Sequence, residues 1–124
     1  MEDIRKKHIA IIGVSDRTEK FGFKIFRDLI KAGFNITGVN PRGIEVLDRK
    51  TYKGIKDINA SIDMIITIVP PGVTEKVVQD AIELGIKQIW MQPGSESPAA
   101  IKKAEDAGIN VRHNACFMVE NGIW

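Results

Sequence analysis

The stretch IAIIGVSDRTEKFG, residues 9–22, joins an apolar run to a glycine turn and then to a segment that can begin a helix. Its first four residues are all apolar, and a second apolar run, MIITIV, occupies residues 64–69. Neither run shows strict alternation of polar and apolar residues, which is typical of strands that helices cover on both faces of a parallel sheet. The two runs therefore predict buried strands near residues 8–12 and 63–69.

Helical patterns lie between and after these runs. Apolar residues recur on one helical face in three segments, which predict helices near residues 21–32, 73–84 and 97–107. A glycine and then an apolar stretch follow each segment, and glycine suits the left-handed position just past a helix end. Ser97 and Pro98 supply the matching start, a serine N-cap with proline at the first helical position.

The repeated order strand, helix, strand predicts the α/β class: a Rossmann-like, doubly wound and mainly parallel sheet of five or six strands with helices on both faces. Further strands are expected near residues 35–39, 87–91 and 110–113. Residues 44–47 are expected to form a short edge strand, and the residues after them, up to 62, contain no convincing helix pattern.

Length and composition fit one folded domain over residues 1–124, with 44% hydrophobic and 27% charged residues. The net charge is only +2 and the basic residues are scattered, so a nucleic-acid partner is not expected. No apolar run is long enough for a membrane span or a signal peptide. The single cysteine forms no internal disulfide, so we expect a cytoplasmic protein.

The turn after the first strand is a candidate phosphate site, because ligands of open α/β sheets bind beyond the carboxyl ends of the strands. Gly13 permits a tight turn, and the amides of the following helix can face an anion. Ser15 adds a hydroxyl, while Arg17 and Lys20 add positive charge. The alternative is an ordinary strand–helix turn with a charged surface loop. Neither GxGxxG nor a Walker A motif is present, which disfavours ATP or GTP hydrolysis.

The second strand ends at Asn40-Pro41-Arg42. An NAD site usually has a carboxylate there, whereas Arg42 suits a ribose that bears a phosphate, as in NADP or coenzyme A. Pro41 offers an apolar surface for a base, although the segment is also ordinary turn chemistry. The third strand runs into Pro70-Pro71, which forms a rigid rim for a base or a pantetheine arm, or else only separates strand from helix.

Other reactive side chains are scattered along the second half of the chain. Gln92 follows a strand and could reach the same cleft, whereas Trp90 is expected in the core. His8 and His113 have no metal-ligand spacing, so no metal site is expected. Cys116 follows the last strand near the ligand edge; a lone cysteine of this kind is more often buried and inert than reactive.

In this order, the segments resemble the CoA-binding domain family: small Rossmann-like proteins similar to the CoA-binding domain of the succinyl-CoA synthetase alpha subunit. The resemblance extends from Ile9 to about Glu120. It implies that coenzyme A binds with its diphosphate on the first turn and its adenosine end over Asn40-Pro41. The larger synthetases carry a catalytic phosphohistidine in a separate domain, which this chain lacks. The expected cofactor-binding residues are Gly13, Val14, Ser15, Arg17, Lys20, Phe21, Gly22, Asn40, Pro41, Arg42, Val69, Pro70, Pro71 and Gln92.

The leading hypothesis is a stand-alone module that binds coenzyme A or an acyl-CoA and has no evident catalytic group. It would serve as a carrier, a sensor or a partner subunit, and a homodimer is an open alternative. One rival is an NADP- or NAD-binding redox protein or sensor, which the missing GxGxxG weakens. Another rival is an enzyme in which Cys116 exchanges thiol or acyl groups with bound coenzyme A.

Overall fold

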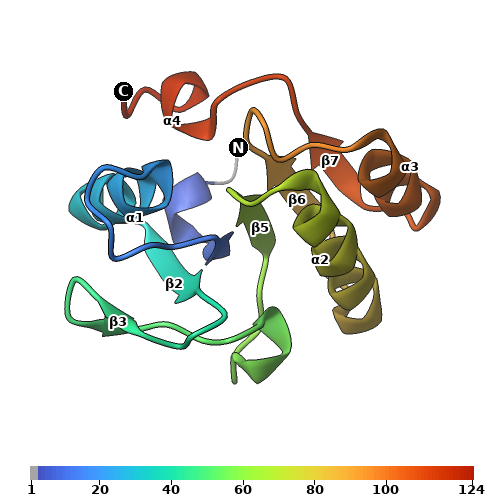
Figure 1. Cartoon of the computed structure of the whole chain (residues 1–124). Coiled ribbons are helices and arrows are strands. Elements are labelled where there is room, and N and C mark those ends of the chain that lie inside the picture. Colours follow the sequence, from blue (N-terminus) through green and yellow to red (C-terminus); the bar gives the residue numbers. More distant parts are fainter. Residues whose placement is uncertain (1–2) are drawn as a thin grey trace.

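Five parallel strands form the central sheet of the computed structural model, which describes residues 3–124 (Figure 1). Their order across the sheet is β2-β1-β5-β6-β7. The strands are β1 (His8–Ile12), β2 (Asn35–Val39), β5 (Met64–Thr67), β6 (Gln88–Met91) and β7 (Asn110–Arg112). The chain therefore builds outward from β1 to β2, then crosses to β5 and continues the other way. This is the doubly wound α/β sheet that the sequence predicts, and its order reverses at β1 and β5.

The two apolar runs become the two central strands. All four residues of β5 are buried, as are Ile9 to Ile12 of β1. Alternate β1 residues serve opposite faces: Ile9 and Ile11 belong to one hydrophobic cluster, and Ala10 and Ile12 to the other. The near absence of polar residues from these runs, in which Thr67 is the exception, therefore reflects helices on both sides of the sheet.

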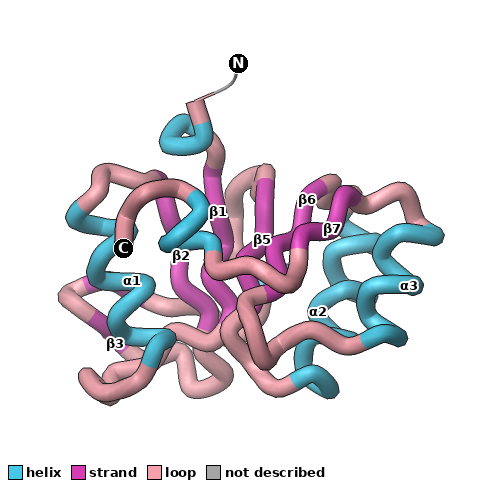
Figure 2. The backbone as a smooth tube through the Cα atoms, turned by 90° about the horizontal axis from the view of Figure 1, so that it is seen from above, coloured by secondary structure: helices cyan, strands magenta, loops and turns pink. Residues whose placement is uncertain are grey.

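Helices cover both faces of the sheet (Figure 2). One face carries α1 (Phe21–Lys31) and the short α4 (Phe117–Glu120), and the other carries α2 (Pro71–Leu84) and α3 (Pro98–Asp106). The predicted serine cap is present, because the amide of Ala100 donates to Ser97 Oγ at 3.0 Å. A 3-10 helix, η1 (Ile4–Lys6), precedes β1. No helix within residues 3–124 combines the length and apolarity that a membrane crossing requires.

The short strand predicted at residues 44–47 is present, but it does not lie at the edge of the main sheet. Instead, β3 (Glu45–Val46) pairs antiparallel with β4 (Arg49–Lys50) in a separate two-stranded hairpin. The chain folds back after only two residues, so these strands pair with each other before either can reach the main sheet. Tyr52 then returns to the edge of β2, where it forms a parallel bridge with Val39. A second 3-10 helix, η2 (Ile55–Asp57), follows.

Candidate functional site

The turn after β1 brings the backbone close to two neighbouring strands. Gly13 has a φ of +105°, and the amides of Gly13 and Val14 both donate to the carbonyl of Val39, at 3.1 and 3.2 Å. A Cβ placed on Gly13 would lie 2.6 Å from the carbonyl oxygen of Ile68. Only glycine fits this position, because both the backbone conformation and the contact exclude a side chain.

The first helix begins directly against this turn. Gly22 is the second residue of α1, and a Cβ there would lie 2.0 Å from the carbonyl oxygen of Gly13. Lys20, the N-cap residue, makes no side-chain hydrogen bond to the first amides of the helix. Those amides are the positive end of the helix dipole, and they lie beside the turn. The arrangement fits an anion at the junction of turn and helix.

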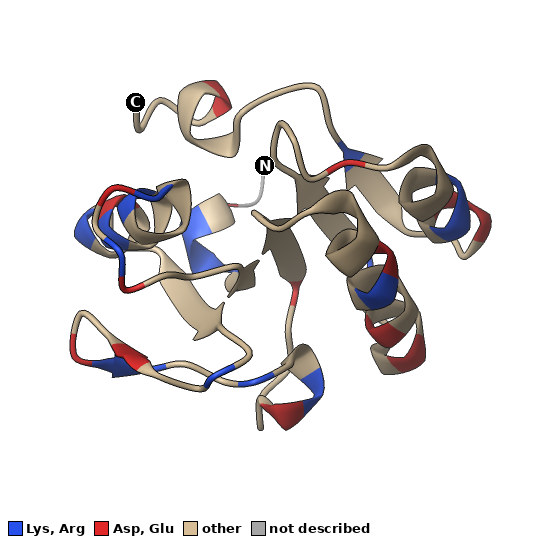
Figure 3. Cartoon of the chain, viewed as in Figure 1, with Lys and Arg blue, Asp and Glu red and all other residues tan. Residues whose placement is uncertain are grey.

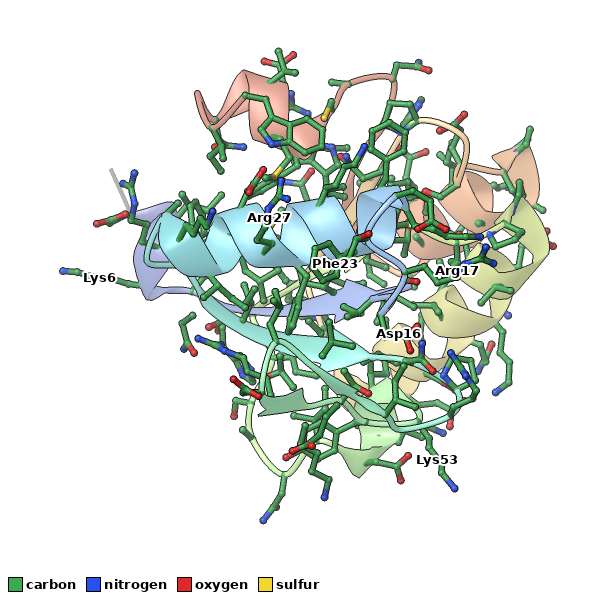
Figure 4. The ribbon with its side chains drawn as sticks, turned by 60° about the vertical axis from the view of Figure 1, so that its left-hand side comes forward. Lys6, Asp16, Arg17, Phe23, Arg27 and Lys53 are labelled. Carbon is green, nitrogen blue, oxygen red and sulfur yellow. The ribbon has the colours of Figure 1, made fainter. Side chains whose placement is uncertain are left out.

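The charged side chains near this junction are already in contact with carboxylates. Arg17 Nε lies 3.0 Å from Glu19 Oε1, and both side chains are exposed. The pKa of Glu19 is lowered, first by a hydrogen bond from its own backbone and also by Arg17. Arg42 Nη2 lies 3.5 Å from Asp16 Oδ1, which brings the two ligand-edge loops together. Asp16 and Arg17 lie on the loop that leads into α1 (Figure 4).

Asn40 links the loop after β1 to the loop after β2 through hydrogen bonds of its side chain. Its side chain is buried, Nδ2 donates to the carbonyl of Val14 at 2.8 Å, and Oδ1 accepts from the amide of Arg42 at 2.8 Å. Its place in the structure is thus between the loop that follows β1 and the loop that follows β2. We assign Asn40 a positioning role, because its amide group makes these contacts within the protein.

A pocket of about 290 Å³ opens beside the turn. Gly13, Pro41 and Val69 line it, so residues predicted from three separate segments of the sequence meet at one cavity. It continues between Ile55, next to η2, and Val77 of α2, and its wall is mostly apolar. An apolar cavity next to a phosphate-ready turn has the form of a nucleotide site.

Three charged residues of this pocket were missed by the sequence analysis: Lys53, Lys76 and Asp80. Lys53 lies in the segment between β4 and η2, whose structure the sequence did not indicate (Figure 4). Lys76 and Asp80 are separated by four residues on α2 and lie on the same face as Val77. The helical spacing of Lys76 and Asp80 could have predicted that they lie beside Val77, whereas the position of Lys53 depends on the tertiary fold.

Gln92 does not line this pocket; it is buried at the end of β6, facing the segment before α4. Its Oε1 accepts from the amide of Phe117 at 2.7 Å, and its Nε2 lies 3.4 Å from Cys116 Sγ. Cys116 is a half-buried free cysteine. Trp90 is in the core, as predicted, and its Nε1 donates to the carbonyl of Ala115 at 2.9 Å.

The remaining predicted residues lie on the rim of this edge or away from it. Pro70 and Pro71 form the exposed start of α2, and Phe21 is the exposed first residue of α1. His8 lies at the start of β1, where its ring nitrogens contact Ser61 O and Thr37 Oγ1 at 2.6 and 2.7 Å. Within residues 3–124, no three His, Cys, Asp or Glu side chains gather as metal ligands do.

Charge along the helices is mixed, with no large basic face in view. On α2 and α3, lysines are interspersed with Asp and Glu (Figure 3). Each of these two helices contains an ion pair between residues i and i+4: Lys76 with Asp80 at 3.8 Å on α2, and Lys102 with Asp106 at 2.9 Å on α3.

Comparison with known proteins gives a family match over nearly the whole chain. A sequence model described as "CoA binding domain" matches residues 7–122. Bacillus subtilis YneT is 26% identical over 119 residues, which cover 96% of this chain and 88% of YneT. The Archaeoglobus fulgidus ADP-forming acetate–CoA ligase II is 37% identical over 101 residues, which cover 80% of this chain and 15% of the ligase.

The solved structures agree with the fold. A conserved hypothetical protein from Pyrococcus furiosus superimposes with a TM-score of 0.87 at 36% identity, over 92% of this chain and 98% of that protein. The matched acetate–CoA ligases are much longer proteins, since this chain spans less than a fifth of each of them. Similarity to those ligases therefore concerns one domain of a larger enzyme.

Proposed function

This chain belongs to the CoA-binding domain family, and we propose from that premise that it binds coenzyme A or an acyl-CoA. The observation that carries the proposal is the apolar pocket of about 290 Å³ that opens next to the Gly13 turn. The turn and the start of α1 offer backbone amides to a diphosphate, and the pocket offers apolar walls to a base. A nucleotide needs both, side by side.

The proposed pose places each part of the cofactor on an element described above. The diphosphate lies on residues 13–15 and the first amides of α1, with Arg17 and Lys20 nearby. The adenine ring enters the pocket between Pro41 and Val69. Arg42 leaves Asp16 to meet the 3′-phosphate, which a distance of 3.5 Å between exposed side chains makes inexpensive.

In this pose, the pantetheine arm extends from the diphosphate along the edge of the sheet formed by the carboxyl ends of the strands. The exposed rim at Pro70 and Pro71 supports its first part. Beyond the rim, Gln92 holds the segment that carries Cys116 and so shapes the surface near the thiol end. The arm thus touches residues that define the cleft, and none of them forms an acid–base pair with a second side chain.

We propose that the chain acts as a stand-alone binding module in the cytoplasm, as a carrier, a sensor or a subunit that supplies the cofactor to a partner. The relatives named as acetate–CoA ligases are much longer proteins, and this chain spans less than a fifth of each of them. Nothing in the lone, half-buried Cys116 points to an oxidising compartment.

Isothermal titration calorimetry with coenzyme A, dephospho-CoA and NADPH tests the proposal. We expect coenzyme A to bind most tightly. Arg42→Ala should weaken coenzyme A binding about tenfold, the loss of one charge-assisted contact, and leave dephospho-CoA binding unchanged. Lys103→Ala removes a charge from α3, remote from the pocket, and should change neither affinity. Tighter binding of NADPH than of coenzyme A would contradict the proposal and favour the redox alternative.

A further inference from the structure

The pocket beside the turn combines mostly apolar walls with a few charged side chains. Its walls near the turn are apolar, and the charged residues that line it are Lys53, Lys76 and Asp80. Lysine side chains donate hydrogen bonds and accept none, whereas an ionised carboxylate accepts and donates none. Among the described residues that line the pocket, Asp80 therefore brings the carboxylate acceptor.

Asp80 is placed by its helix to face the pocket. Val73, Lys76, Val77 and Asp80 follow the spacing of one helix face, and all four line the cavity. Counting from Pro71, Asp80 lies in the third turn of α2, well below the rim. A nucleotide whose diphosphate rests on the Gly13 turn would carry its base along α2 toward this carboxylate.

Two lysines lie near the Asp80 carboxylate, but neither is close enough to donate a hydrogen bond to it. The Asp80 side chain is 21% exposed, Oδ1 lies 3.7 Å from Lys56 Nζ, and Oδ2 lies 3.8 Å from Lys76 Nζ. Both distances exceed those of a hydrogen bond, and Lys56 makes its short contact with Glu83, at 2.5 Å. The oxygens of the Asp80 carboxylate therefore keep free acceptor positions.

We propose that Asp80 makes this pocket selective for adenine over a 6-oxopurine, by accepting a hydrogen bond from the exocyclic amino group. Hypoxanthine and guanine present a carbonyl oxygen at the same position, so that this oxygen would face the carboxylate as a second acceptor and the hydrogen bond made by adenine would be lost. Two acceptors in contact discriminate against the 6-oxopurine, because the carboxylate loses a hydrogen-bond donor. The inference rests on the proposed function, because it assumes that a nucleotide base enters the pocket.

Calorimetry with coenzyme A and with its deaminated analogue, in which hypoxanthine replaces adenine, tests the inference. The wild-type protein should bind coenzyme A roughly tenfold or more tightly than the analogue, the value of a hydrogen bond to a charged group. In Asp80→Asn the amide offers both a donor and an acceptor, so the ratio should fall toward one or reverse. Asp106→Asn makes the same substitution on α3, outside the pocket, and should keep the wild-type ratio.

Each outcome separates the inference from the proposed function. If the wild-type protein binds neither compound, the proposed function fails. Equal affinity of the wild-type protein for both compounds overturns the role of Asp80 and leaves coenzyme A binding intact, and this comparison needs no variant to fold. An Asp80→Asn protein that keeps the wild-type ratio also overturns it, whereas a ratio that falls in Asp80→Asn but not in Asp106→Asn supports it.

Discussion

Gly22 and Gly72 occupy the same position in two helices, since each is the second residue of its helix, α1 or α2. Their surroundings differ completely. A Cβ on Gly22 would meet a carbonyl oxygen of the first turn, whereas a Cβ on Gly72 would meet no atom within 4 Å. Packing thus requires a glycine at position 22, whereas no contact requires one at position 72. The pair allows the effect of tight helix–turn packing to be measured against an internal reference.

We expect Gly22→Ala to lower the free energy of unfolding by about 1–3 kcal/mol, the usual cost of overpacking, and to weaken coenzyme A binding because α1 must move off the turn. Gly72→Ala should instead raise stability slightly, by at most about 1 kcal/mol, because alanine restricts the unfolded chain. Urea denaturation and calorimetry measure the two effects. Equal denaturation midpoints for the two variants would show that the contact at Gly22 is relieved without cost.

At the scale of elements, the β3–β4 hairpin carries strain in its turn. The two residues that join its strands, Leu47 and Asp48, have φ values of 52° and 61°. Two-residue hairpins of this kind favour Asn and Gly at these positions, because a positive φ is unfavourable for a bulky L-residue. Leu47 is also 42% exposed and therefore gains little from burial in return.

Replacing Asp48 with glycine should relieve part of this strain and raise the free energy of unfolding by about 0.5–1 kcal/mol. Thermal unfolding followed by circular dichroism should then show a midpoint a few degrees higher. Asp48→Ala provides the comparison, since alanine tolerates a positive φ less well than aspartate and should lower the midpoint. A lower midpoint for the glycine variant would mean that the Asp48 side chain stabilises the hairpin.

The elements that the sequence predicted correctly have strong local signals. The apolar run of β5 fixed a central strand, and Ser97 with Pro98 marked the start of α3, because neither signal depends on distant residues. The hairpin was missed because its strands have two residues each and its turn contains neither Asn nor Gly. Periodicity cannot be read over so short a span.

The sequence likewise indicated some residues of the candidate site and not others. Turn residues such as Gly13 and Pro41 could be assigned because the fold class fixes which end of each strand faces a ligand. The partners of Gln92 and Asn40 could not, since their hydrogen bonds join segments about 25 residues apart. The position of Lys53 on the pocket wall likewise follows from the return of the chain after β4.

At the scale of the whole molecule, the last residue is attached to the first helix. Trp124 Nε1 donates to Asp28 Oδ2 at 2.7 Å, and its ring lies 6.1 Å from that of Phe21. The C-terminal segment thus runs back over α1, as seen from above (Figure 2). Val119, Phe21 and Trp124 are all at least 45% exposed, so this end of the molecule presents apolar side chains around the start of α1.

The hydrogen bond from Trp124 to Asp28 predicts that the free energy of unfolding falls in acid. The pKa of Asp28 is lowered from its ordinary value of 3.8, first by the hydrogen bond from Arg27 and then by that from Trp124. Because the folded pKa lies below the unfolded one, the stabilisation is complete above about 3.8 and is lost as the pH falls through the lowered folded value. Tryptophan fluorescence should change over that range. Trp124→Phe should abolish the change, and its persistence would assign it to Trp90 instead.

The order of the strands also governs what happens while the chain is being synthesised. β1 is made before both of its neighbours, yet it pairs with β2 and β5, and Ile9 meets Met64 about 55 residues later. At roughly 5–20 residues per second, the ribosome needs about 3–11 s to deliver that second neighbour. Throughout this time the apolar strand has at least one open edge in the nascent chain. The centre of the finished sheet is therefore the part most exposed to misassociation during translation, and slow codons between residues 40 and 63 would prolong that exposure.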